Sequence, residues 1–122
     1  MDMRLELVPL PASDVDRSLK FYVEQVGFHL DHDVEPGNGM RIVQLTPPGS
    51  ACSVVIGVGM GAADAPPVSG LHLVVEDVEA ARALLSGRGV EVSEVSDMGG
   101  GVRYAYFSDP DGNSWALQEI RR

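Results

Sequence analysis

Two stretches of the chain share one pattern of apolar and polar positions. Each opens with a short apolar run of strand length, Leu5–Leu10 in the first and Leu71–Val75 in the second. An acidic residue, Asp14 or Asp77, then stands where a helix would begin. Apolar residues follow at helical spacing: Val15, Leu19, Val23 and Val26 in the first stretch, and Val78, Ala81 and Leu85 in the second.

The similarity between the two stretches extends beyond the helices. Gly27 and Gly89 are predicted to end them, and Phe28/Leu30 and Val90/Val92 then alternate with polar residues as half-buried strands do. Arg41–Leu45 aligns with Arg103–Phe107 at nearly the same offset as Asp14 with Asp77. This internal repeat predicts two βαβββ modules, residues 5–58 and 70–121, joined by a linker over residues 59–69 in a single domain, residues 1–122.

Neither module alone can cover both faces of its own small sheet. Pairing them predicts an α+β fold, in which a curved eight-stranded mixed sheet carries the helices outside and leaves a concave inner face. Residues two apart on a strand share a face of this sheet.

The composition and the net charge of the chain argue against several classes of function. Apolar residues make up 44% of the 122 residues, no apolar run is long enough for a transmembrane helix, and no secretory signal is visible. The net charge of -9 disfavours binding to nucleic acid or to anionic membranes. Because Cys52 is the single cysteine, no intrachain disulfide can form, and we expect a reducing cytoplasmic location.

Three further patterns are typical of structure and not of a functional site. Gly57, Gly59 and Ala62 match a dinucleotide-binding outline, but Pro66-Pro67 leaves no room for the helix that this motif requires. The cluster of His29, Asp31, His32 and Asp33 is typical of an exposed strand edge, with His32 on the opposite face from the other three. Cys52 is predicted to be a packed small residue.

The segments Ser13–Tyr22 and Phe107–Glu119, the latter containing Asp-Pro-Asp-Gly-Asn at 109–113, resemble the vicinal oxygen chelate superfamily. This superfamily includes glyoxalase I, bleomycin-resistance proteins and extradiol dioxygenases. The resemblance covers nearly the whole chain and implies the glyoxalase/bleomycin-resistance fold and a homodimer. The 109–113 segment itself follows from turn chemistry.

Enzymes of this superfamily hold a divalent metal with one residue from the first and last strand of each module. The resemblance places these four positions at Leu7, Ile56, Gly70 and Glu119. Only Glu119 offers a donor atom, and metal sites need about three protein ligands, so no metal or other cofactor is expected. His72, two residues beyond Gly70, is the one additional candidate ligand.

The remaining predicted cavity wall is apolar and aromatic. The residues expected to bind a ligand on the concave face are His72, Tyr104, Tyr106, Trp115, Leu117, Glu119, Val54 and Ile56. Aromatic rings with one carboxylate suit a flat or amphipathic organic molecule.

We therefore predict a metal-free protein that resembles the bleomycin-resistance branch and sequesters an antibiotic or natural product stoichiometrically. A superfamily enzyme is the alternative: a metal-dependent lyase, isomerase or dioxygenase that uses His72 and Glu119. A metal-free enzyme with Glu119 as general base, and a scaffold that serves association only, also remain open.

Overall fold

The computed structural model describes residues 1–58 and 65–120, in which the same order of elements occurs twice. The first module consists of β1 (Leu7–Pro9), α1 (Val15–Lys20), the π-helical segment η1 (Phe21–Val26), β2 (His29–Gly37), β3 (Met40–Thr46) and β4 (Ser53–Val58). The second consists of β5 (Leu71–Val75), α2 (Val78–Gly87), β6 (Ser96–Asp97), β7 (Val102–Ser108) and β8 (Ser114–Ile120).

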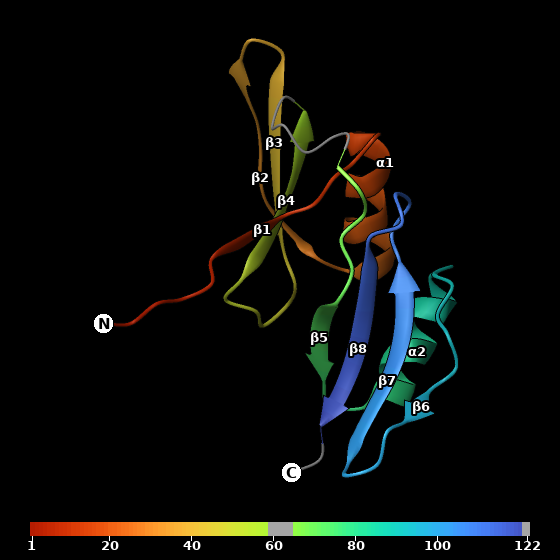
Figure 1. Cartoon of the computed structure of the whole chain (residues 1–122). Coiled ribbons are helices and arrows are strands. Elements are labelled where there is room, and N and C mark those ends of the chain that lie inside the picture. The colour runs from red at the N-terminus through yellow and green to blue at the C-terminus, as the bar shows by residue number, and fades with distance from the viewer. Residues whose placement is uncertain (59–64, 121–122) are drawn as a thin grey trace.

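Each module forms its own four-stranded mixed sheet. The strand order is β1-β4-β3-β2 in the first sheet and β5-β8-β7-β6 in the second (Figure 1). In both, the first strand pairs in parallel with the last, and the other pairs are antiparallel. The predicted α+β class and repeated topology are confirmed, but within one chain the strands divide into two sheets with β1 and β5 at their edges.

The predicted acidic caps begin both helices. Asp14 accepts a hydrogen bond from the Arg17 N–H at 3.1 Å, and Asp77 accepts from Glu79 and Ala80 at 2.9 and 3.1 Å. Gly27 ends the first helix in the left-handed conformation, with a φ of 96° that residues with a side chain rarely adopt. The spacing of apolar residues therefore identified the helices, although it did not reveal the π-helical geometry of η1.

Two details differ from the sequence-based expectations. Val90 and Val92 are buried as predicted, but they lie in irregular chain before β6 and not in a strand. The Ser93 N–H bonds the Tyr106 carbonyl at 2.9 Å, which ties this segment to β7 without regular pairing. Gly57 of the glycine pattern lies within β4, whereas Gly59 and Ala62 lie outside the described residues.

One apolar core joins the modules. The helical segments of the first module lie against the core-facing side of the second sheet, and α2 covers the same side lower down (Figure 1). The buried Tyr22 hydroxyl donates to Asp109 at 2.6 Å and accepts from the Trp115 indole N–H at 3.0 Å. Asn113, also buried, donates to the Pro11 carbonyl at 3.0 Å and accepts from the Val68 N–H at 2.9 Å. The 109–113 turn therefore holds the two modules together.

Asp111 forms a second, less buried link between the modules. It accepts from the Ser13 hydroxyl at 2.6 Å and the Ser13 N–H at 3.0 Å, and it lies 3.7 Å from Arg17. Burial acts to raise the pKa of Asp111, but the hydrogen bonds from Ser13 and Ser18 outweigh burial and hold the pKa below its usual range.

This link predicts acid sensitivity. A carboxylate whose pKa is lowered by folding stabilises the protein above its unfolded pKa of about 3.9, and this stabilisation is lost as pH falls through the lower folded value. We expect Asp111→Asn to lower the free energy of unfolding at pH 7. In this variant the free energy of unfolding should also fall less between pH 5 and pH 3 than it does in the unchanged protein. Urea midpoints of both proteins at each pH measure this difference. An unchanged pH dependence in the variant would contradict it.

No helix among the described residues is long and apolar enough to cross a membrane.

Candidate functional site

The two faces of the second sheet differ in their surroundings. On β8, Trp115, Leu117 and Glu119 point toward the helices and are buried; Trp115 is only 3% exposed. Its ring lies 5.5 Å from Phe28 and stacks on Phe107 at 6.2 Å between ring centroids. These three residues, which were expected on the concave face, therefore lie on the helix-facing side of the sheet: Trp115 and Leu117 pack in the core, and Glu119 bonds the start of α2.

The first sheet repeats this arrangement. Val54 and Ile56 on β4 are buried in the same core, beside Val43 and Leu45 of β3. They too lie on the helix-facing side and not on the predicted concave face. An apolar residue at position 56, where the superfamily resemblance places a metal ligand, fits these apolar surroundings.

Glu119 is held inside the protein by specific partners. Its carboxylate accepts from the Val78 N–H at 2.9 Å and from Arg103 Nε and Nη2 at 3.0 and 3.1 Å. These bonds raise the pKa of the Arg103 guanidinium. Glu119 therefore anchors the start of α2 to the sheet and is already engaged as an acceptor.

The open face of the second sheet carries an aromatic cluster, which we define as His72, Tyr104 and Tyr106. The two tyrosine rings stack with centroids 6.0 Å apart and an interplanar angle of 12°. His72 meets Tyr104 edge-on at 5.8 Å. Gln118, beside Tyr104 on β8, donates to the tyrosine hydroxyl at 3.1 Å. Tyr106 is 44% exposed, so the cluster presents ring faces on the surface of a single chain.

The orientation of His72 follows from its backbone partner. Nδ1 lies 2.8 Å from the Gly70 carbonyl oxygen, which can only accept, so Nδ1 carries the proton and donates. In the neutral ring the unprotonated Nε2 is then an acceptor for a ligand's N–H or O–H. His72 pairs with Ala116 on β8, an odd number of residues from Glu119. His72 and Glu119 consequently lie on opposite faces of the sheet, and the structure does not bring this predicted pair together.

The side of the first sheet that faces away from the core carries a row of polar side chains, of which Ser53 is buried. The hydroxyls of Thr46 and Ser53 lie 2.6 Å apart, Gln44 donates to Ser53 at 3.3 Å, and Thr46 donates to Asp31. Sequence reasoning missed this polar row, together with Gln118. The repeat contained a usable signal, because Gln44 aligns with Tyr106, and a glutamine amid apolar neighbours marks the solvent-facing side of a strand.

The remaining residues singled out from the sequence lie outside the aromatic cluster. Leu7 on β1 and Gly70 just before β5 are exposed, and Cys52 is half-buried. His29 and His32 are exposed on the edge strand β2, as expected for a polar edge. The predicted strict alternation is wrong here, because an irregularity between Leu30 and His32 places His32 opposite Gln44.

The donor atoms do not suit the metal that the superfamily resemblance implies. Among residues 1–58 and 65–120, no three His, Cys, Asp or Glu side chains lie close enough to hold an ion. Beside His72 the open face offers Ala116, Tyr104 and Gln118. A lone imidazole with neutral neighbours does not fit a divalent cation that needs about three protein ligands.

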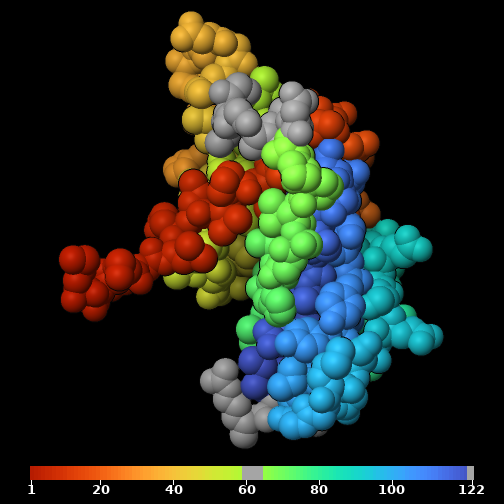
Figure 2. Space-filling view, viewed as in Figure 1, coloured from red at the N-terminus to blue at the C-terminus, as the bar shows by residue number. Residues whose placement is uncertain are grey.

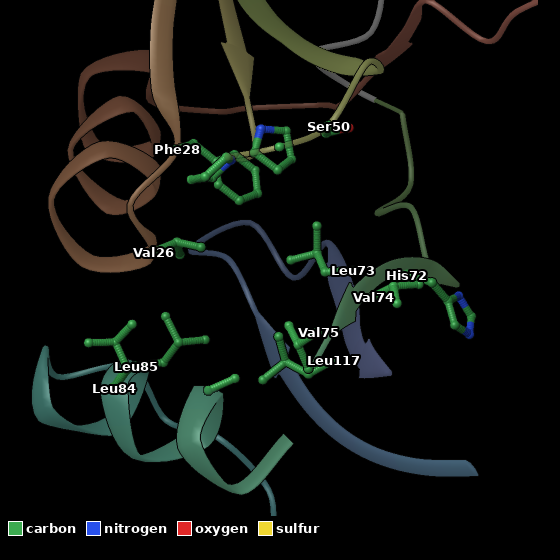
Figure 3. Close-up of a pocket in the computed structure, with 14 residues that line it drawn as sticks. Val26, Phe28, Ser50, His72, Leu73, Val74, Val75, Leu84, Leu85 and Leu117 are labelled. Carbon is green, nitrogen blue, oxygen red and sulfur yellow. The ribbon is translucent and has the colours of Figure 1, made fainter. Parts of the chain in front are cut away.

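A separate apolar cleft of about 450 Å³ lies between the modules. Figure 3 shows Val26 and Phe28 of the first module on one side and Leu84 and Leu85 of α2 on another, with the His72 ring directed away from them. The cleft therefore lies on the helix side of β5, and the aromatic cluster lies on the other side.

A family model and the similar solved structures indicate the same protein family. Residues 4–117 match the model of the Glyoxalase/Bleomycin resistance protein/Dioxygenase superfamily. No curated protein matches the chain.

Several solved structures are similar over nearly their full length. TnmS3, an antibiotic binding protein from Streptomyces sp. CB03234, is 37% identical, with a TM-score of 0.85 and 98% of each chain covered. A glyoxalase/bleomycin resistance protein from the same organism is 38% identical, with a TM-score of 0.78 and coverage of 93% of this chain and 98% of that one. A superfamily member from Sphaerobacter thermophilus DSM 20745 is 31% identical, with a TM-score of 0.83 and coverage of 97% and 98%.

Proposed function

Because the chain belongs to the Glyoxalase/Bleomycin resistance protein/Dioxygenase superfamily, we propose that it binds a small organic molecule and sequesters it stoichiometrically. The ligand is an antibiotic or a related natural product. The similarity to the antibiotic binding protein TnmS3 supports this choice within a superfamily of diverse activities.

The observation that carries the proposal is the aromatic cluster. Two stacked tyrosine rings and an edge-on histidine form a surface on which a planar ring system buries area at low entropic cost. His72 Nε2 and the Tyr104 hydroxyl lie at its border and orient polar groups of the ligand. The net charge of -9 favours a cationic ligand over an anionic one.

The proposed assembly is a homodimer in the cytoplasm. In one chain the aromatic cluster is uncovered, and exposed Val74 lies on the same face. A second copy that brings its own open face over this cluster would enclose the ligand. The polar row of Gln44, Thr46 and Ser53 would then hydrogen-bond the ligand's polar edge.

The proposed binding needs no metal and no reaction. His72 has neutral neighbours on the open face, and Glu119 is engaged with Arg103 on the other side. A general base must reach the proton that it abstracts, and a carboxylate under the sheet does not reach a ligand on its open face. This separation favours sequestration over the enzymatic alternatives.

Titration calorimetry tests the proposal with two probes: proflavine, a planar cation, and bleomycin. We expect saturable binding of at least one probe at one molecule per site, with the same affinity after EDTA treatment, and recovery of an unaltered probe by mass spectrometry. Weak, non-saturating heats with both probes would count against the ligand class. Binding that disappears with EDTA, or a chemically changed probe, would favour the enzymatic alternatives.

A further inference from the structure

The polar row of Gln44, Thr46 and Ser53 ends at a carboxylate, that of Asp31 on β2. β2 is the edge strand of its sheet, and the tip of the hairpin that it forms with β3 projects from the body of the molecule (Figures 1 and 2). Gln44 and Thr46 alternate with fully buried core residues of β3, so their side chains point to the other face. The row is therefore accessible from the face away from the core, with Ser53 as its buried member.

The Asp31 carboxylate fixes the direction of the hydrogen bonds along this row. An ionised carboxylate only accepts, so Thr46 donates its single hydroxyl proton to Asp31. The Thr46 oxygen lies 2.6 Å from the Ser53 oxygen, and the proton between them must then come from Ser53. Ser53 has no second proton, so it accepts from the Gln44 side-chain N–H at 3.3 Å. Both hydroxyls of the row thus donate toward Asp31 and have no proton left for a ligand.

The atoms that remain for a ligand are mainly acceptors. With one N–H on Ser53, the Gln44 amide holds its carbonyl oxygen Oε1 elsewhere, and this oxygen has no partner among the described residues. Buried polar side-chain atoms in the described part of the chain all have partners, so Oε1 is accessible. The second oxygen of Asp31 lies 3.7 Å from the exposed His29 ring. The row therefore offers lone pairs and one negative charge, against a single remaining amide N–H of Gln44.

We propose that the polar row selects ligands whose polar edge carries a protonated amine, and disfavours ligands that offer only carbonyl or ether oxygens there. This inference rests on the proposed function and names a polar group of the bound compound. An ammonium group has three donors and no acceptor, so it matches the Gln44 carbonyl and the Asp31 carboxylate. Charge-assisted hydrogen bonds of this kind are stronger than neutral ones. A carbonyl oxygen would instead desolvate these acceptors without supplying a proton.

The direction of the hydrogen bonds adds to the effect of charge. The net charge of -9 attracts cations of any shape. The row is more specific, because a rotated Gln44 amide would place its carbonyl against the Ser53 oxygen, which has no proton to donate. Removal of the Ser53 hydroxyl should therefore free the amide to present either its carbonyl or its N–H groups to a ligand.

Three probes with the same ring test this preference by heteronuclear NMR titration. Benzylamine is protonated and only donates, benzyl alcohol donates and accepts, and acetophenone only accepts. Shifts of the Gln44 side-chain amide and of the backbone amides of β3 give a Kd for each probe. We expect the Kd of benzylamine to be lower than that of acetophenone by about tenfold or more, with benzyl alcohol between them. Equal Kd values for benzylamine and acetophenone would overturn the proposal.

Two variants and a matched control distinguish bond direction from charge. Ser53→Ala keeps the Asp31 charge and frees the Gln44 amide, so the preference for benzylamine over acetophenone should fall by about threefold or more. Asp31→Asn should lower the preference further. Glu35→Gln removes the same charge from an exposed position on β2 and should keep the preference. The dispersion of the amide spectrum shows that each variant is folded. A full preference in the Ser53→Ala variant would refute the role of bond direction.

Calorimetry with proflavine and bleomycin is judged separately. Saturable binding of either compound, without an amine preference at the polar row, would refute this inference and leave the sequestration proposal standing. An amine preference at the row, without binding of either compound, would support the row as an ammonium site and count against the proposed ligand class.

Discussion

Tyr22→Phe is expected to lower the free energy of unfolding by about 2–3 kcal/mol. The substitution keeps the ring, which stacks on Phe28 at 5.2 Å, and removes only a fully buried hydroxyl. Asp109 then loses a 2.6 Å donor and the Trp115 indole N–H loses its acceptor, so two buried polar groups are left short of partners. The cost is large for one oxygen atom because this hydroxyl joins the helix of one module to the sheet of the other.

Urea unfolding, followed by Trp115 fluorescence, measures this loss, and Tyr106→Phe is the matched control. Tyr106 is exposed and its hydroxyl has no partner among the described residues, so its removal is expected to cost under about 0.5 kcal/mol. Burial raises the pKa of Tyr22 well above its usual range. The Tyr22 contribution is therefore complete below the unfolded pKa of about 10, and the effect should be equal at pH 7 and pH 9. Equal losses in the two variants would contradict the role assigned to the network.

The fold was predictable because the sequence pattern occurs twice, so an element indicated in one module supports the same element in the other. Asp14 and Asp77 cap their helices as predicted, and each module forms the same strand order. The π-helical turn of η1 and the irregularity in β2 were not predictable. A local pattern of apolar and polar residues specifies neither the π-helical geometry of Phe21–Val26 nor the register shift between Leu30 and His32 of β2.

The candidate site was only partly predictable, because strand parity fixes which residues share a face but not which face is open. Tyr104 and Tyr106 were correctly grouped, as were Trp115, Leu117 and Glu119. The prediction that the second group lines the cavity depends on interpreting Glu119 as a ligand position. In the structure the Glu119 carboxylate instead bonds Arg103, its neighbour on β7, and the Val78 N–H. A glutamate at this position resembles a ligand residue in sequence, although in the structure it forms an ion pair in which Glu119 is buried and Arg103 is partly exposed.

Tyr104→Ala is expected to weaken binding of the tighter of the two calorimetry probes by about tenfold to hundredfold. The substitution removes the central ring of the aromatic cluster, which touches both Tyr106 and His72. Truncating one aromatic anchor costs about 2 kcal/mol or somewhat more, and 1.4 kcal/mol corresponds to a factor of ten. Titration calorimetry gives the change in Kd, and the urea midpoint shows whether the half-buried Tyr104 also contributes to folding.

Two further variants distinguish ring stacking from hydrogen bonding by the hydroxyl. Tyr104→Phe keeps the ring and loses the 3.1 Å bond to Gln118, so binding should weaken by no more than about threefold if the ring faces dominate. Met98→Ala removes an exposed apolar side chain from the loop before β7 and should leave affinity unchanged. If the phenylalanine variant lost as much affinity as the alanine variant, the hydroxyl and not the ring would carry recognition. If neither variant lost affinity, the ligand would bind elsewhere, and the inter-module cleft on the other side of β5 would be the next surface to test.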